Sequence, residues 1–268
     1  MKGVTTYNVR AVWLGGGLTP AAIGQRFLST LRQLGPLSPA MSNWQLGDPP
    51  IPRWVPLADV APRMTEVVEH NVQLDDDRDP YPEDGYCVVS QGSAVPSEFG
   101  GPDKIHLAAN VGGRWLNKLE FEVGSLVSPP DLLLVTYPIY KGALEALAAN
   151  WPCPWALAFA FTPSDEPAGR WVNEKDLYAR MRAPFEVAWI AYLSAPLAKG
   201  LAPPPEIVSE RTPGGGVILS AMQERLDPAN SEHMRRSRML EAIMDERVGC
   251  VGPYRSQTAE LPARVGPY

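Results

Sequence analysis

The glycine runs are the first residues in the sequence whose type and spacing could support chemistry. Gly15-Gly16-Gly17 stands between an expected strand and an expected helix, where backbone N–H groups can bind phosphate. The run matches neither G-x-G-x-x-G nor G-x-x-x-x-G-K-[ST], so a plain strand-to-helix turn is the competing and simpler interpretation. A second run, Gly214-Gly215-Gly216, is better explained by the positive φ angles that a hairpin needs.

Patterns for metal binding or nucleophilic catalysis are missing from the sequence. The three histidines are far apart, the three cysteines form no C-x-x-C pair, and no G-x-S-x-G elbow is present. The run Asp75–Asp79 has neither the D-x-D-x-D-G register nor the distal glutamate of a calcium loop. We therefore expect a protein that is not an enzyme and that uses no metal and no cofactor.

An acidic loop is the most informative surface feature that the sequence contains. It covers DDDRDPYPED, residues 75–84, in which two prolines stiffen the chain. One interpretation is an ordinary solvated loop. The other is a patch that attracts a basic partner over long range, with an aromatic anchor of the kind enriched in interface cores. The candidate partner-binding residues are Asp75, Asp76, Asp77, Asp79, Tyr81, Glu83 and Asp84.

Charge and hydropathy restrict the class of protein further. The net charge of the 268 residues is −6, and residues 62–104 alone hold ten acids against three bases. Direct binding of nucleic acid is not expected, because it relies on Lys and Arg to neutralise phosphates. The start of the chain lacks the apolar run of a signal peptide, and the apolar region 131–161 is interrupted by charges and prolines. With three widely spaced cysteines, these features predict a cytoplasmic protein without a membrane span.

Hydrophobic periodicity predicts the following elements. Thr19-Pro20 is typical of a helix start, and Gly35-Pro36 of a helix end. Pro138 forbids an uninterrupted helix over 131–150. The expected strands are 4–14, 42–46 within a proline-rich loop, 86–90, 106–110, 114–123 and 155–161, and the expected helices are 20–34, about 59–74, and part of 131–150.

The C-terminal part of the sequence carries the densest set of signals. Apolar residues alternate from Phe185 to Leu193, as in a half-buried strand, and extended runs at 207–211 and 217–222 flank the second glycine run. Asn230 is the expected cap of a final helix. Together the elements predict an α+β fold with a largely antiparallel or mixed sheet flanked by helices. We expect a single domain over 1–248, either compact or two-lobed, and an extended peripheral tail over 249–268.

The order of these features over residues 8–247 resembles the immunity protein 52 family of bacterial polymorphic toxin systems. The resemblance rests on the order of these features. Trp13 and the glycines after it come first, followed by a helix and Trp44, and Trp151 comes later, before an apolar strand. Its strongest part is C-terminal: Trp189, Tyr192-Leu193-Ser194, the proline-rich passage, Gly214-Gly215-Gly216, Asp227, Asn230 and His233. The sequence departs from the family pattern at Gly16–Thr19, where an acid-containing turn is common, and at Ser231, where proline is frequent.

The resemblance implies a non-enzymatic inhibitor that binds a cognate type VI-secreted toxin effector and protects the producing cell and its kin. The partner in this family is typically a restriction-endonuclease-like nuclease domain. Two other classes stay open. One is a cytoplasmic small-molecule-binding protein or enzyme without a recognisable motif, which a deep apolar pocket would favour. The other is a chaperone or adaptor that loads an effector, which would bind the part of the effector that is not toxic.

Overall fold

The computed structural model of the chain describes residues 5–48, 51–74, 79–92, 105–114, 116–124, 130–161 and 186–249, and the structural statements below concern these residues. Residues 250–268 of the expected tail lie outside them.

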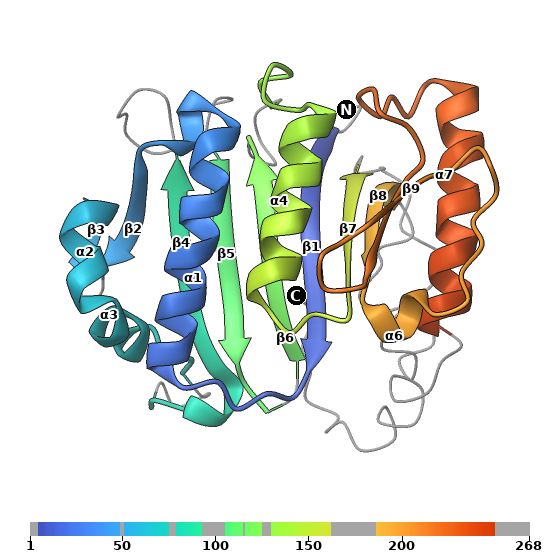
Figure 1. The fold of residues 1–268 in the computed structure, drawn as a ribbon. Coiled ribbons are helices and arrows are strands. Elements are labelled where there is room, and N and C mark those ends of the chain that lie inside the picture. Colours follow the sequence, from blue (N-terminus) through green and yellow to red (C-terminus); the bar gives the residue numbers. More distant parts are fainter. Residues whose placement is uncertain are drawn as a thin grey trace.

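A ten-stranded sheet forms the centre of the described structure (Figure 1). The strand order is β3-β2-β4-β5-β6-β1-β7-β8-β10-β9, and each neighbouring pair is antiparallel. The prediction of an α+β fold with a largely antiparallel sheet is confirmed. The strands are β1 (Thr6–Leu14), β2 (Trp44–Asp48), β3 (Ile51–Pro56), β4 (Gly85–Gly92), β5 (Ile105–Gly112), β6 (Leu116–Val123), β7 (Trp155–Phe161), β8 (Glu186–Leu193), β9 (Val208–Arg211) and β10 (Val217–Ser220).

Helices α1 and α4 lie on one side of this sheet (Figure 1), and α7 packs against β8. The Thr19 hydroxyl accepts a hydrogen bond from the Ala22 N–H at 3.3 Å, so the predicted start of α1 is confirmed. The α-helices are α1 (Pro20–Leu34), α2 (Leu57–Val60), α3 (Met64–His70), α4 (Tyr137–Asn150), α6 (Ala195–Ala198) and α7 (Ser231–Met244), with 3-10 turns η1 (Gly35–Leu37), η2 (Pro39–Met41), η3 (Ala61–Arg63) and η4 (Pro82–Asp84) and a π-helical turn η5 (Asp245–Gly249).

Tyr140 of α4 connects the helix layer to three strands. Its ring packs edge-to-face on Phe121 of β6 and on Tyr7 of β1, and lies 5.2 Å from the ring of Trp189 of β8. Its hydroxyl donates a buried hydrogen bond of 2.7 Å to the Tyr7 carbonyl. Because aromatic pairs add about 0.5–1.5 kcal/mol each to ordinary burial, this cluster fixes the position of α4 on the sheet.

The two sides of the central strands differ in polarity. Residues opposite one another in the register share a side, and Val9, Phe121 and Leu107 on the α4 side are fully buried. On the other side, Arg10 lies opposite Glu120, and Glu122 lies opposite His106. This period-2 alternation places a row of charged residues on the side of β1, β5 and β6 that α1 and α4 do not cover.

Asn117 of β6 joins three backbone segments from a fully buried position. Its amide oxygen accepts from the Gly112 N–H at 2.6 Å, and its Nδ2 donates to the carbonyls of Gly15 and Gly113 at 2.6 and 3.3 Å. The side chain therefore holds the loop after β1 against the turn between β5 and β6.

Three sequence-based expectations need correction. The helix expected over about 59–74 is divided into α2, η3 and α3 around Pro62, and it ends at His70 because Val72 pairs with Tyr86. The proline-rich loop contains β3, which is an edge strand, the position where strands tolerate proline. Helix α4 begins at Tyr137 with Pro138 in its first turn, which confirms the prediction that only part of 131–150 is helical.

The third correction concerns β8, which was expected to be half-buried. Its residues from Ala188 to Leu193 are all buried, because α4 and α7 both pack against it and β7 and β10 flank it. Strand β8 therefore belongs to the interior of the sheet.

Replacing Asn117 with alanine should lower the free energy of unfolding by about 2–4 kcal/mol, because three backbone groups, two of them buried, lose a hydrogen-bond partner. Urea denaturation measures the change. Asn110→Ala is the matched control, since Asn110 is half-buried and accepts one long bond from Gln73, and it should cost less than about 1 kcal/mol. Equal losses for the two variants would contradict the assigned role of Asn117.

Candidate partner-binding surface

The acidic loop predicted from the sequence is described only in part. Asp75, Asp76 and Asp77 lie outside the described residues. Asp79, Tyr81, Glu83 and Asp84 belong to the segment Asp79–Gly85, named here the acidic turn, which leads into β4.

Backbone hydrogen bonds hold the acidic turn on both sides. On one side, the Tyr81 N–H donates to the Gln73 carbonyl at 2.7 Å and the Gln73 N–H donates to the Gly85 carbonyl at 2.9 Å. On the other side, the Arg114 N–H donates to the Glu83 carbonyl at 2.9 Å. These bonds tie the turn to the chain before it and to the turn between β5 and β6.

Gly85 allows the acidic turn to lie directly on the backbone of the neighbouring strand. Its φ of +92° is a conformation that other residues rarely adopt. A Cβ atom at this position would lie 2.5 Å from the Gly113 nitrogen and 2.5 Å from the Val111 carbonyl oxygen. The close approach explains why the turn has a defined shape despite its exposed side chains.

The carboxylates of the acidic turn are not equivalent. Glu83 Oε2 forms an ion pair of 2.6 Å with Arg114 Nη1 and accepts a hydrogen bond of 3.3 Å from the Tyr81 hydroxyl. The Glu83 charge raises the pKa of Tyr81. Asp84 is exposed and forms no side-chain contact of this kind within the described residues. Part of the predicted negative charge is therefore compensated at Glu83, whereas the Asp84 carboxylate faces solvent.

A second charged surface lies on the side of the sheet away from α1 and α4. We name it the polar sheet face and define it by Asn8, Arg10, His106, Asn110, Lys118, Glu120 and Glu122. At its centre, Glu120 pairs with Arg10 at 2.9 Å and with Lys118 at 2.7 Å. Burial acts to raise the pKa of Glu120, but the two cations outweigh burial and hold the pKa below its usual value.

Glu122 lies two residues beyond Glu120 on the same side of β6 and behaves in the opposite way. Burial, and secondly the charge of Glu120, raise the pKa of Glu122 to about 7. The sequence contained the signal for this surface in the alternation of Lys118, Glu120 and Glu122 with Leu119, Phe121 and Val123. The alternation predicted the strand correctly, but it did not show which side a helix would cover.

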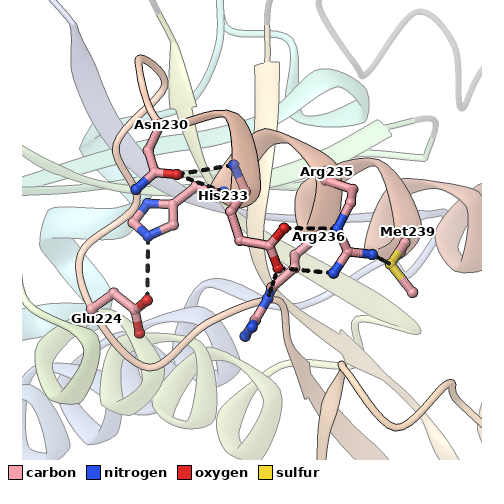
Figure 2. Close-up of polar contacts among 7 residues, drawn as sticks. Glu224, Asn230, His233, Arg235, Arg236 and Met239 are labelled. Carbon is pink, nitrogen blue, oxygen red and sulfur yellow. Dashed lines mark hydrogen bonds and ion pairs between the residues drawn. The ribbon is translucent and has the colours of Figure 1, made fainter.

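The Asp227–His233 segment has a structural role (Figure 2). The Asn230 amide oxygen caps α7 by accepting from the N–H groups of Glu232 and His233, at 2.9 and 3.3 Å. His233 Nδ1 accepts from the Asp227 N–H at 3.0 Å, and its Nε2 lies 3.2 Å from Glu224 Oε1. The histidine thus fastens the loop before α7, and the predicted cap at Asn230 is confirmed.

In the first turn of α7, Glu232 forms ion pairs with Arg235 and Arg236, both at 2.8 Å. Hydrogen bonds from the two guanidinium groups lower the pKa of Glu232 to about 2. This pairing compensates the arginines that stand unfavourably near the start of the helix.

The two glycine runs form turns. The φ angles of Gly15, Gly16 and Gly17 are +64°, +136° and +43°, and the run connects β1 to α1. In the other run, the Thr212 N–H donates to the Gly216 carbonyl at 3.0 Å and closes the β9–β10 hairpin, as predicted.

An open groove of about 550 Å³ lies between α1, α2 and the start of β2. Its lining combines apolar side chains with amides and one cation, and it contains no residue of the acidic turn or of the polar sheet face. The lining includes Leu28, Arg32, Trp44, Gln45, Leu57 and Gln91. Within the described ranges, no group of three or more His, Cys, Asp or Glu residues is arranged to hold a metal ion.

None of the helices in the described part of the chain is long and apolar enough to cross a membrane. In comparisons with known proteins, no family model and no curated protein sequence matches the chain. Among solved structures, the chain is similar to a Pseudomonas aeruginosa T6SS protein, PA0821, with 15% sequence identity and a TM-score of 0.49. The match covers 92% of this chain and 74% of the other.

The Glu122→Gln variant tests whether the surroundings of the Glu122 carboxyl raise its pKa. Because the pKa rises from 4.5 in the unfolded chain to about 7 in the fold, Glu122 contributes stability below about pH 4.5 that is lost as the pH rises through 7. At pH 5, the free energy of unfolding of the uncharged variant should therefore be close to that of wild type. At pH 8.5, it should be higher than that of wild type by on the order of 1–3 kcal/mol.

Chemical denaturation at the two pH values measures this difference. Glu145→Gln removes one negative charge from the exposed surface of α4 and serves as the control, with little change in relative stability expected. A difference between Glu122→Gln and wild type that is the same at pH 5 and pH 8.5 would show that Glu122 has an ordinary pKa.

Proposed function

We propose that the chain is an immunity protein that neutralises a cognate type VI-secreted polymorphic nuclease toxin by direct binding, and so protects the producing cell and its kin. The sequence resemblance over residues 8–247 suggests this function. The structural observation that supports it best is the acidic turn, which presents an exposed carboxylate at Asp84 on a backbone fixed from both sides.

A nuclease domain is a suitable partner for such a surface on physical grounds. An enzyme that cleaves nucleic acid must bind phosphates, and it does so with Lys and Arg side chains. Carboxylates on an inhibitor can pair with the same cations and exclude the substrate from them. The net charge of −6 adds a long-range attraction that speeds association and weakens as salt increases.

The shape of the acidic turn also favours binding. A loop that must become ordered on contact loses part of its interaction energy, whereas a pre-ordered loop does not. Here Gly85 and the hydrogen bonds to Gln73 and Arg114 fix the turn before a partner arrives. Tyr81 is half-buried within the turn, and its ring adds apolar area beside the charges.

Co-expression with the toxin encoded by the neighbouring gene tests the proposed function. Wild type should restore growth and co-purify with the toxin domain. Failure to protect against any neighbouring toxin would contradict the proposal. Binding only to a part of the effector outside the toxin domain would instead favour a chaperone or adaptor.

Reversing the charge of the acidic turn with Asp79→Lys/Asp84→Lys should weaken binding about tenfold or more at low salt, mainly through slower association. Kinetic binding measurements at low and high ionic strength measure the effect, which should shrink at high salt. Asp59→Lys/Glu145→Lys carries the same change in net charge on exposed helix positions and should leave the low-salt affinity much closer to wild type. Equal effects of the two double variants would show that net charge, rather than the acidic turn, controls binding.

A further inference from the structure

Glu122 is a charged group that the described fold does not pair. Arg10 and Lys118, the cations of the polar sheet face, both bind Glu120. Glu122 makes no hydrogen bond or ion pair within the described part of the chain. The charge that acts on it most is that of Glu120, which is also negative.

Glu122 is accessible to a partner that approaches the sheet from the side opposite to α4. The aromatic cluster of α4 packs on Phe121, whose side chain points to the other side of β6. Glu122 shares its own side with His106 of β5 and Asn8 of β1, which lie directly opposite it in the register, and all three are half-buried. A long side chain from a partner surface can reach such a group.

The polar sheet face adjoins the acidic turn. Gln73 accepts the Tyr81 N–H with its backbone carbonyl, and its side-chain Nε2 lies 3.3 Å from Asn110 Oδ1 on the polar sheet face. Asn110 in turn lies opposite Lys118. A partner docked on the acidic turn therefore meets the polar sheet face next to it, without an intervening helix among the described residues.

We propose that the polar sheet face is a second contact surface for the toxin, on which the Glu122 carboxylate receives a lysine or arginine side chain of the partner. The inference rests on the proposed function and adds to it a specific pairing. A half-buried carboxylate beside a like charge gains more from an incoming cation than a solvated carboxylate does, because it has less hydration to lose. A nucleic-acid-binding surface supplies such cations.

The pairing couples binding to the release of a proton. The titratable and charged groups around Glu122 are Glu120 and Lys118 on β6, His106 on β5 and Arg10 on β1. A bound cation keeps Glu122 ionised, whereas the free protein carries the proton on a large fraction of molecules near neutral pH. The affinity for the partner should therefore rise with pH. The Glu122→Gln variant should lack the part of this rise that comes from ionisation of Glu122.

Isothermal titration with the purified, catalytically inactivated nuclease domain encoded by the neighbouring gene tests the inference. Between pH 6 and pH 8, the Kd of wild type should fall about tenfold more than that of Glu122→Gln. The variant should bind about tenfold more weakly than wild type at pH 8 and almost equally at pH 6. Glu145→Gln, which removes a charge from α4, should follow wild type at both pH values.

Each outcome has a separate meaning, provided that circular dichroism shows the variants to be folded. If wild type binds and Glu122→Gln shows the same affinity and the same pH dependence, the inference about Glu122 is wrong and the proposed function stands. If wild type does not bind the nuclease domain at either pH, the proposed function fails and the inference fails with it.

Discussion

The contact of Tyr140 with Tyr7, Phe121 and Trp189 is the interaction on which the architecture depends most. One helical side chain joins three strands, β1, β6 and β8, and its hydroxyl satisfies a backbone carbonyl inside the core. With α4 fixed there, the helix layer covers one side of the central strands (Figure 1). The alternating strands then place their charged residues on the other side. The position of the proposed binding surface therefore follows from the position of the core.

The two proposed contact surfaces are held by the same few backbone contacts. Asn117 fixes the turn between β5 and β6, Arg114 on that turn bonds to Glu83, and Gly85 lies against Gly113. The acidic turn is thus supported by the strands that also carry the polar sheet face. An inhibitor needs such rigidity, because a pre-ordered surface loses less conformational entropy on binding than a loop that must fold.

Local signals in the sequence predicted much of the fold. The Thr19 cap, the Asn230 cap and the glycine hairpin each satisfy backbone groups through nearby residues, so the chain around them is sufficient to identify them. Strand β3 pairs with β2, which directly precedes it in the chain, but its prolines are more typical of a loop than of a strand. The full burial of β8 depends on neighbours far away in the chain, and no local pattern encodes those neighbours. In the same way, the alternating charged residues of β6 predicted a strand. They did not show that Glu120 pairs with two cations, or that Glu122 has no ion pair within the described residues.

Inhibition of the toxin in a purified system is the most direct test of the central claim. The proposed partner, a nuclease toxin encoded by a neighbouring gene, would be mixed with increasing amounts of this protein, and cleavage of DNA would be followed at low salt. We predict that cleavage falls in proportion to the added protein and stops at a fixed molar ratio, because a tight stoichiometric complex keeps DNA from the enzyme. Unchanged cleavage in the presence of a large molar excess of folded protein would contradict the account.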